Sequence, residues 1–320
     1  MKNLFNLLAL ILLLSMGACS SEVIVSEEPN NENEAEITEL VAFMGKLQYE
    51  NIDSRTSVTI GEFGSKYAEL VWAEKDTLGI YPTVDNQLSF SGDQLSFPII
   101  EGVGTSKCIF TGGGWALKNS TAYKAYSPFN RAYYYHKNDN LPISMLGQKQ
   151  IGNGNSDHLG KYDLQIAQGK TPEQGKIEFN FEHQVSFIRM DLTAPKAATW
   201  KSITLKSDAL FTTEASMDMS KEIPTLTSTS TANSVTLELE NVATEVDEVI
   251  TAYMLVLPVD FTEKQLYIIL TDSDDKTFKS QAIIYNDNRN FRAGNVRWIK
   301  TDFIPNNIEN PSESEESKWK

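Results

Sequence analysis

The chain has 320 residues, and its 43 acidic against 28 basic side chains give a formal net charge of −15. Nucleic-acid binding needs clustered basic side chains, so this balance predicts no nucleic-acid partner and favours a self-repelling chain that faces water. Beyond the N-terminal segment, no stretch of the sequence is long and apolar enough to cross a membrane.

The N-terminal segment has the pattern of an export signal. Lys2 supplies the positive start, and residues 4–14 form an apolar run that is too short to span a bilayer. The sequence MGAC that ends at Cys19 resembles a bacterial lipobox, although Met16 stands where the pattern prefers leucine. Residues 1–18 are therefore predicted to be a lipoprotein signal peptide and Cys19 the lipidation site, with two acyl chains giving stable anchoring in outer-membrane lipid. The alternative is an ordinary cleaved signal with an incidental cysteine.

The segment that follows is polar. Residues 19–36 are acidic and rich in asparagine, and we expect them to form a flexible tether. Once Cys19 is lipidated, Cys108 is the one remaining thiol, so a disulfide framework is excluded. Because Ile109 and Phe110 flank it, Cys108 is expected to be a small core residue.

After the tether the periodicity is that of β-strands. Ile177, Phe179 and Phe181 alternate with polar residues, which indicates a strand with one buried face. Residues 264–287 predict two strands joined by a turn at the aspartate-rich residues 272–276. No apolar face recurs at helical spacing over three turns. The chain is therefore predicted to be an all-β sandwich protein.

The domain organisation is predicted from a change in composition. Residues 136–176 are rich in Gly, Asn and Asp and indicate a long irregular connection, which would be unusual inside one compact domain. We therefore expect two tandem sandwiches, one in residues 37–175 and one in residues 176–303. Residues 304–320 are polar and acidic and predict a disordered tail.

No catalytic constellation is evident in the sequence. The three histidines, His136, His158 and His183, form no metal-binding pair, and one thiol cannot complete a zinc cluster. No G-x-S-x-G elbow occurs, and the glycines of residues 111–117 lack the Gly-Lys-Ser/Thr of a phosphate loop. Residues 272–283 lack the glycine and the closing glutamate of a calcium loop. We expect no enzyme activity, no metal and no cofactor, and we expect His183 to be a hydrogen-bonded structural residue.

Four stretches, in order along the chain, resemble motifs of one known family. They are residues 54–57 with 71–82 (SRTS, VWAEKDTLGIYP), 123–129 (YKAYSPF), 162–170 with 177–192 (YDLQIAQGK, IEFNFEHQVSFIRMDL) and 291–303 (FRAGNVRWIKTDF). With the lipobox, their order and spacing resemble the fimbrillin family, the pilus subunits and related surface lipoproteins of anaerobic Gram-negative bacteria. In the last stretch, residues 296–298 stand in place of the tyrosine region of the family pattern.

The resemblance implies two tandem transthyretin-like β-sandwiches made as a lipoprotein precursor. Stalk subunits of the family are cut after an arginine behind the first strand, which removes that strand with its lipid and opens a groove. A strand from the next subunit then fills the groove by β-strand addition. On this chain the removable strand lies within residues 37–50, and its buried face is either Leu40, Ala42 and Met44 or Val41 and Phe43.

The same resemblance places a candidate protease cleavage site between Arg55 and Thr56. The alternative is that Arg55 is an ordinary turn residue. At the other end of the chain, residues 296–303 either serve as the donor strand or close the chain's own sandwich. The second case fits an anchor, a tip or a stand-alone lipoprotein rather than a stalk subunit.

The sequence thus predicts a non-enzymatic, lipid-anchored surface protein, structural or accessory to fimbriae and involved in adhesion, with other fimbrial subunits or itself as partners. The alternative is a glycan-binding surface lipoprotein of a nutrient-uptake system, based on the tyrosine-rich residues 133–135, with host or bacterial surface glycans or proteins as partners. A glycosidase would need two suitably placed carboxylates, and no motif indicates such a pair. The expected location is the outer membrane, or the fimbrium after processing.

Overall fold

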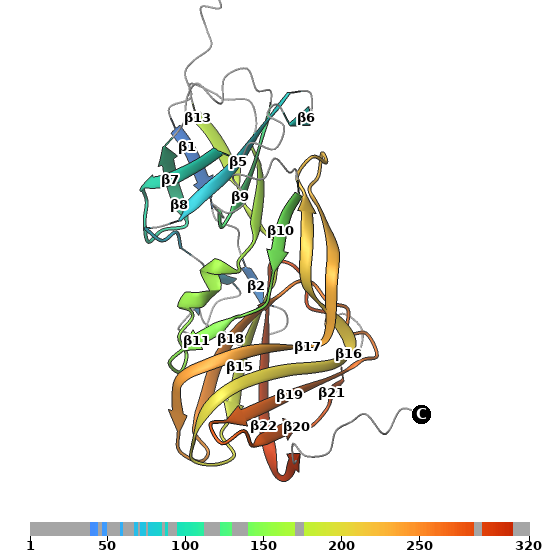
Figure 1. Ribbon diagram of the computed structural model, residues 1–320. Helices are drawn as coiled ribbons and strands as arrows, with labels where there is room; N and C mark the ends of the chain where they lie inside the picture. Colours follow the sequence, from blue (N-terminus) through green and yellow to red (C-terminus); the bar gives the residue numbers. More distant parts are fainter. Residues whose placement is uncertain are drawn as a thin grey trace, which may run out of the picture. The chain divides into compact units, whose positions relative to one another are not determined.

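The computed structural model describes residues 39–43, 47–49, 58–59, 67–69, 71–74, 76–84, 87–88, 95–111, 122–129, 140–169, 176–284 and 290–309. Their regular structure is β-strand apart from one 3₁₀ turn, η2 (Asp157–Lys161), so the all-β prediction is confirmed (Figure 1). Among these residues, no helix has the length and apolar character to span a membrane.

The first sheet contains nine strands among the described residues, in the order β13-β1-β8-β7-β5-β9-β12-β14, with β6 paired to β5. Their bounds are β1 (Glu39–Phe43), β5 (Thr77–Val84), β6 (Gln87–Leu88), β7 (Leu95–Glu101), β8 (Lys107–Thr111), β9 (Ala122–Ser127), β12 (Gln165–Gly169), β13 (Lys176–Asn180) and β14 (Glu182–His183). β12 also pairs with β13, where Gly169 lies opposite Phe179, so the sheet closes on itself. Glycine is required there because a Cβ on Gly169 would lie 2.6 Å from the Phe179 ring.

The inside of the first sheet is filled by apolar side chains from all its main strands. Ile177, Phe179 and Phe181 are buried, as their alternation with polar residues predicted. Trp72, which precedes β5, packs edge-on against Phe110 and Phe181 with ring centroids 5.3 and 5.6 Å apart. Edge-to-face packing of this kind adds to the burial of each ring. β1 contributes Leu40 and Ala42 to this core.

The second sheet contains thirteen strands among the described residues and is folded into two layers. Their bounds are β2 (Leu47–Tyr49), β3 (Val58–Thr59), β4 (Tyr67–Glu69), β10 (Asn140–Ser144), β11 (Lys149–Ile151), β15 (Ser186–Thr193), β16 (Ala198–Asp218), β17 (Thr225–Thr244), β18 (Val249–Val256), β19 (Gln265–Asp272), β20 (Thr277–Ser280), β21 (Ile283–Ile284) and β22 (Asn295–Glu309). One layer pairs β15 with β18 and β22, and the other pairs β17, β16, β19 and β20. Apolar side chains of both layers meet in one core, which makes a β-sandwich. The predicted hairpin of residues 264–287 is the β19–β20 pair, turning at residues 272–276.

Strand pairing differs from the domain boundaries expected from the sequence. β13 falls after the expected boundary at residue 175, but it pairs with β1 and β12 in the first sheet. β10 and β11 fall before that boundary, but they pair with β16 and β17 in the second sheet. β22 continues through Glu309, beyond the expected end at residue 303. The reason is that periodicity along a strand reveals its buried face but not its partner. The expected signal, tether and last residues of the tail lie outside the described residues.

A third apolar cluster joins residues of the two sheets. It includes Tyr81 and Tyr126 from the first sheet together with Leu141, Met217 and Leu255 from the second. Because these side chains are buried, the end of β9 and the strand β10 are held against the long β16–β17 hairpin.

Candidate functional site

β1 lies inside the first sheet, with a partner strand on each side. It runs parallel to β13 and antiparallel to β8, so Leu40 lies between Ile177 and Phe110. In the same way, Ala42 lies between Phe179 and Cys108. Leu40 and Ala42 have no exposed surface, and both belong to the core of the first sheet.

The structure therefore selects one of the two buried faces expected for this strand. Leu40 and Ala42 point inward, whereas Val41 lies outside that core cluster although it is only 5% exposed. Phe43 is half-buried, and the Lys107 ammonium lies over its ring, 5.4 Å from the centroid. Met44 lies outside the described residues.

Loss of β1 would leave a slot between β8 and β13. Five residues of each neighbour would lose the strand partner on that side, and the apolar side chains beneath would face water. Burial of one leucine side chain is worth about 2 kcal/mol. An empty slot of this kind therefore favours any strand that offers apolar side chains at the positions of Leu40 and Ala42.

Cys108 forms part of the wall of this slot. Its side chain is fully buried, as expected for a core residue. Burial raises the pKa of the thiol to about 11, and the nearby Asp76 carboxylate contributes to the same shift. The thiol is therefore protonated at neutral pH and serves packing, since thiolates are the reactive form.

The site residues expected from the sequence are not among those that the structure describes. Cys19 precedes β1, and Arg55 and Thr56 come between β2 and β3 in the chain. The tyrosine-rich residues 133–135 also lie outside the described residues. Lipidation, cleavage and glycan binding at these positions stay predictions.

His183 is buried and hydrogen-bonded to Asp163. His183 Nδ1 lies 2.7 Å from Asp163 Oδ1, and the Asp163 Oδ2 atom accepts a hydrogen bond from Gln165 at 2.7 Å. The prediction that His183 is a hydrogen-bonded structural residue is therefore confirmed. Within the described ranges, no group of three or more His, Cys, Asp or Glu side chains is placed to hold a metal ion.

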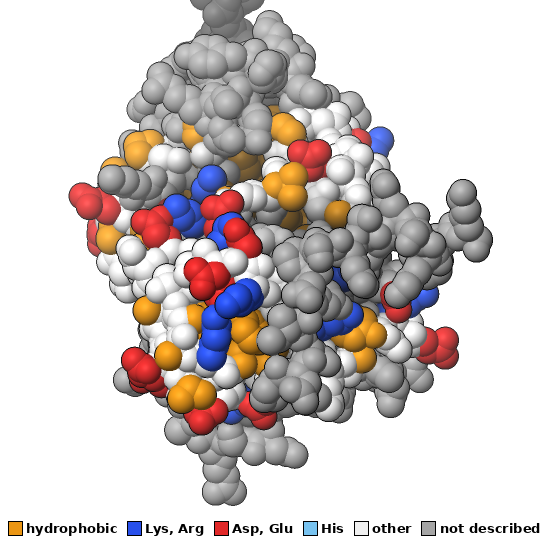
Figure 2. All heavy atoms as spheres, turned by 60° about the horizontal axis from the view of Figure 1, so that its bottom comes forward, with side chains coloured by type: hydrophobic (Ala, Val, Ile, Leu, Met, Phe, Trp, Pro, Cys, Tyr) orange, Lys and Arg blue, Asp and Glu red, His pale blue; other side chains and the backbone are white. Residues whose placement is uncertain are grey.

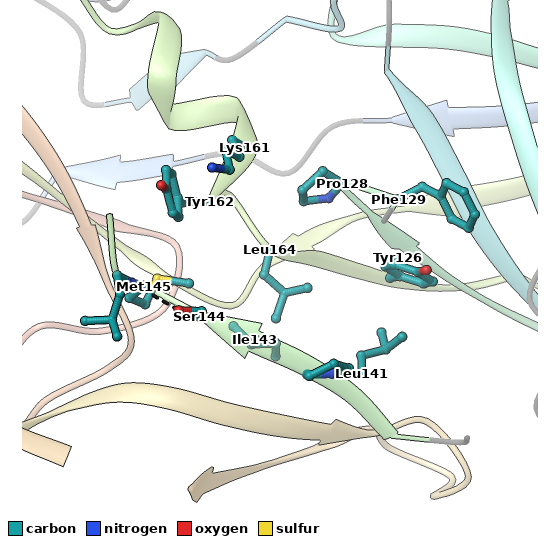
Figure 3. Close-up of a pocket in the computed structure, with 12 residues that line it drawn as sticks. Tyr126, Pro128, Phe129, Leu141, Ile143, Ser144, Met145, Lys161, Tyr162 and Leu164 are labelled. Carbon is teal, nitrogen blue, oxygen red and sulfur yellow. Dashed lines mark hydrogen bonds between the residues drawn. The ribbon is translucent and has the colours of Figure 1, made fainter. Parts of the chain in front are cut away.

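A pocket of about 430 Å³ lies where the end of β9 meets β10 and η2 (Figure 3). Tyr126 approaches from β9, Phe129 from the residues just after it, Leu141 from β10, and Lys161 and Tyr162 from the end of η2. The lining is mainly apolar, with the Lys161 ammonium 5.0 Å from the Tyr162 ring centroid. This pocket was not predicted from the sequence, because three separate segments, residues 126–129, 141–146 and 161–164, come together to line it.

Charged side chains are mixed over the face that Figure 2 shows. Lys and Arg lie beside Asp and Glu among the described residues, and hydrophobic side chains occur between them in small groups. This face therefore carries positive and negative side chains close together rather than a broad region of one charge.

A family model described as fimbrillin-like matches residues 62–319. The chain therefore belongs to the fimbrillin-like family. This confirms the family resemblance carried by the four sequence motifs. Sequence comparison with curated proteins gave no match.

Solved structures similar to this fimbrillin-like protein include proteins from Bacteroides and Porphyromonas. A candidate cell adhesion protein from Bacteroides ovatus ATCC 8483 aligns with a TM-score of 0.53 at 13% identity, over 87% of this chain and 98% of that chain. A candidate cell adhesion protein from Bacteroides uniformis ATCC 8492 aligns with a TM-score of 0.48 at 15% identity, over 75% and 93% of the two chains. The fimbrial anchor protein Mfa2 from Porphyromonas gingivalis aligns with a TM-score of 0.35 at 10% identity, over 82% and 90%. The first of these shows a shared fold.

Proposed function

We propose that the chain is a non-enzymatic accessory subunit of surface fimbriae that contributes to adhesion. In this proposal it is exported as a lipoprotein and held on the outer membrane through Cys19. Membership of the fimbrillin-like family supports the fimbrial role, and the lipobox supports the anchor. Its partners are other fimbrial subunits.

The observation that carries an accessory role is the position of β22. Residues 296–302 pair in parallel with residues 187–193 of β15, and Ser280 of β20 pairs with Phe303. A donor strand has to be free to enter a neighbouring subunit. Because β22 is built into its own sandwich, the arrangement supports an anchor, a tip or a stand-alone role over that of a stalk subunit.

In this proposal, β1 is the strand whose removal would open a groove for a donor strand. Cleavage after Arg55 would release every residue before Thr56, and hence β2 as well as β1. β1 would leave the first sheet, whereas β2 would leave its partners β22 and β4 in the second sheet. A donor strand from another subunit could then restore the first sheet by β-strand addition.

The experiment is the intact mass and the N-terminus of the protein from outer membranes and from sheared surface material. A lipid-modified chain that begins at Cys19 and is confined to the membrane fraction is expected for an anchor or stand-alone lipoprotein. Cys19→Ala should then move the protein out of that fraction. A chain that begins at Thr56 in sheared material would instead identify a polymerising pilin.

Two arginine variants separate cleavage from general damage. Arg55→Ala should abolish any product that begins at Thr56, whereas Arg292→Ala, which changes an exposed arginine just before β22, should leave processing unchanged. A fimbrial role is contradicted if deletion of the protein changes neither fimbriation nor adhesion.

A further inference from the structure

β18 is the outermost strand of its layer among the residues that the structure describes, because it pairs with β15 on one side only. This pairing runs along the whole strand without a register shift. Residues 249–256 (VITAYMLV) contain no charged residue, proline or glycine. Short segments of this kind pair readily with other strands, and natural sheet edges are blocked by charge, proline or a bulge. β18 has none of these protections in its own sequence.

Side chains take the place of a strand along the outward edge of β18. Gln148 Oε1 accepts a hydrogen bond from the Leu255 N–H at 2.8 Å, and Gln148 Nε2 donates to the Leu255 carbonyl at 2.6 Å. Gln150 Oε1 accepts from the Tyr253 N–H at 2.9 Å, and Gln150 Nε2 donates to the Thr251 carbonyl at 2.8 Å. Each glutamine therefore replaces a peptide group of a neighbouring strand, since a side-chain amide has the same kinds of donor and acceptor.

Two further side chains complete this edge. Asn153 Oδ1 accepts from the Thr251 N–H at 2.7 Å, and Asn153 Nδ2 donates to the Val249 carbonyl at 2.9 Å. His158 Nε2 lies 3.0 Å from the Tyr253 carbonyl. From the Val249 carbonyl to the Leu255 carbonyl, the outward backbone groups of β18 therefore all have a partner.

These side chains belong to one stretch, residues 148–158, which we call the cap segment. Its backbone is fixed on β17, because β11 pairs with residues 238–240 and the Glu238 N–H donates to the Gln148 carbonyl at 3.0 Å. Gln150 is fully buried, and Gln148 is 2% exposed. The cap segment thus covers part of β17 with its backbone and the edge of β18 with its side chains.

We propose that the cap segment protects β18 from pairing with strands of other chains. A buried amide that leaves β18 loses its own hydrogen-bond partners, so opening of this edge costs free energy. Without these amides, residues 249–256 present a regular, uncharged strand edge to solvent. The same strand of a second copy then pairs with it, and the chain associates.

Gln148→Met/Gln150→Met tests this protection, because it removes both amides and keeps side chains of similar length. The full chain carrying Cys19→Ser is used, so that lipid does not drive association. Hydrogen exchange of the peptides that span β18 and β15 is measured by mass spectrometry. The outward N–H groups of β18 should exchange at least about tenfold faster than in the wild type, whereas the β15 peptide should be unchanged. Sedimentation should show association that rises with concentration and exceeds that of the wild type.

Two control variants separate the loss of the cap segment's amides from general damage. Gln165→Met removes a buried amide from the first sheet, where it donates to Asp163, and should leave β18 exchange and association unchanged. Val249→Lys, added to the double variant, places a charge at an exposed position of β18. It should keep the fast exchange and reverse the association, because charge on an edge strand opposes the addition of another strand.

Circular dichroism and the melting temperature show whether each variant is folded. If the double variant does not fold, Asn153→Ala decides, because it removes one exposed amide and should have the same two effects to a smaller extent. Unchanged β18 exchange in the folded variant overturns the proposal. So does fast exchange without association, or equal association of Gln165→Met. None of these results depends on the fimbrial role, so this proposal and the proposed function fail separately.

Discussion

The Lys124 side chain on β9 donates a hydrogen bond to the main-chain oxygen of Met219, at 3.1 Å, and so joins the first sheet to the turn between β16 and β17. The same ammonium group also donates to the Lys221 carbonyl. Lys124 is 5% exposed, and burial lowers its pKa while Asp218 and Glu222 act in the opposite sense. A buried amine with carbonyl partners is costly to replace, because those carbonyls then lose their donor.

Lys124→Met should therefore destabilise the protein, although methionine keeps a similar side-chain length. The expected loss is about 1–3 kcal/mol in the free energy of unfolding, because it leaves buried carbonyl groups unsatisfied. Denaturant unfolding measures it. Lys264→Met changes an exposed lysine and should stay within about 0.5 kcal/mol of the wild type. Equal stability of the two variants would show that the Lys124 contact contributes nothing.

Gly79→Ala should disturb the packing of β5 against β9. A Cβ on Gly79 would lie 2.0 Å from Cε1 of Tyr126, whose ring packs between Tyr81 and Phe129 at centroid distances of 6.1 and 6.2 Å. The ring has little room to move, so we expect a loss of about 1–3 kcal/mol from overpacking.

Gly160→Ala is the matched control for Gly79→Ala. Gly160 lies in η2, and a Cβ there would have no neighbour within 4 Å. The free energy of unfolding of the Gly160→Ala variant should differ from that of the wild type by less than about 1 kcal/mol. Thermal unfolding of both variants compares the two sites, and similar losses at Gly79 and Gly160 would contradict the steric explanation.

His158 should make the protein less stable in mildly acidic solution. Its Nε2 lies 3.0 Å from the Tyr253 carbonyl, and burial lowers its pKa below the ordinary 6.5. The unfolded chain therefore binds a proton more readily than the folded one, so stability falls as the pH decreases through 6.5 toward the folded pKa.

His158→Gln removes the titrating group and keeps a hydrogen-bond donor for Tyr253. The variant should show a flatter dependence of unfolding free energy on pH between about 5 and 7. Denaturant titrations at several pH values measure the slope. An unchanged slope in the variant would assign the pH dependence to other groups.

The sequence predicted those features of the fold that depend on residues close together in the chain. The alternation of Ile177, Phe179 and Phe181 predicted a strand and its buried face, and both are as expected. The partner of that strand was not predictable, because β1, its parallel neighbour, lies more than a hundred residues earlier. Parallel pairing leaves no turn signal in the chain, unlike the β19–β20 hairpin with its aspartate-rich turn.

The candidate site at β1 was also predictable only in part. The buried set Leu40 and Ala42 was one of two faces allowed by alternation, and only the positions of β8 and β13 decide between them. The pairing of β11 with β17 had no signature in the sequence, because it depends on a contact between residues 149–151 and residues 238–240.

The turn between β19 and β20 should bind no calcium, despite its three aspartates. Asp272 Oδ1 accepts hydrogen bonds from the N–H groups of Asp274 and Lys276, both at 2.9 Å, and Asp272 Oδ2 lies 2.5 Å from the Lys196 ammonium. Both oxygens of this carboxylate are therefore engaged. Millimolar calcium should leave the melting temperature unchanged, and a clear rise would show that the ion displaces Lys196.

Asp272→Asn should destabilise the protein by removing a buried charge partner of Lys196. Burial raises the pKa of Asp272, but Lys196 and the backbone N–H groups outweigh it and hold the pKa below 3.8. The stability that this carboxylate adds is present above pH 3.8 and is lost as the pH falls through its folded pKa.

For Asp272→Asn we expect a loss of about 1–3 kcal/mol in the free energy of unfolding at neutral pH and a smaller loss in acid. Asp275→Asn, in the same turn but exposed and paired with exposed Lys201, should cost about 0.5 kcal/mol or less. Denaturant unfolding at pH 7 and pH 3 distinguishes the two, and an equal cost at both pH values would mean that the charge of Asp272 plays no part.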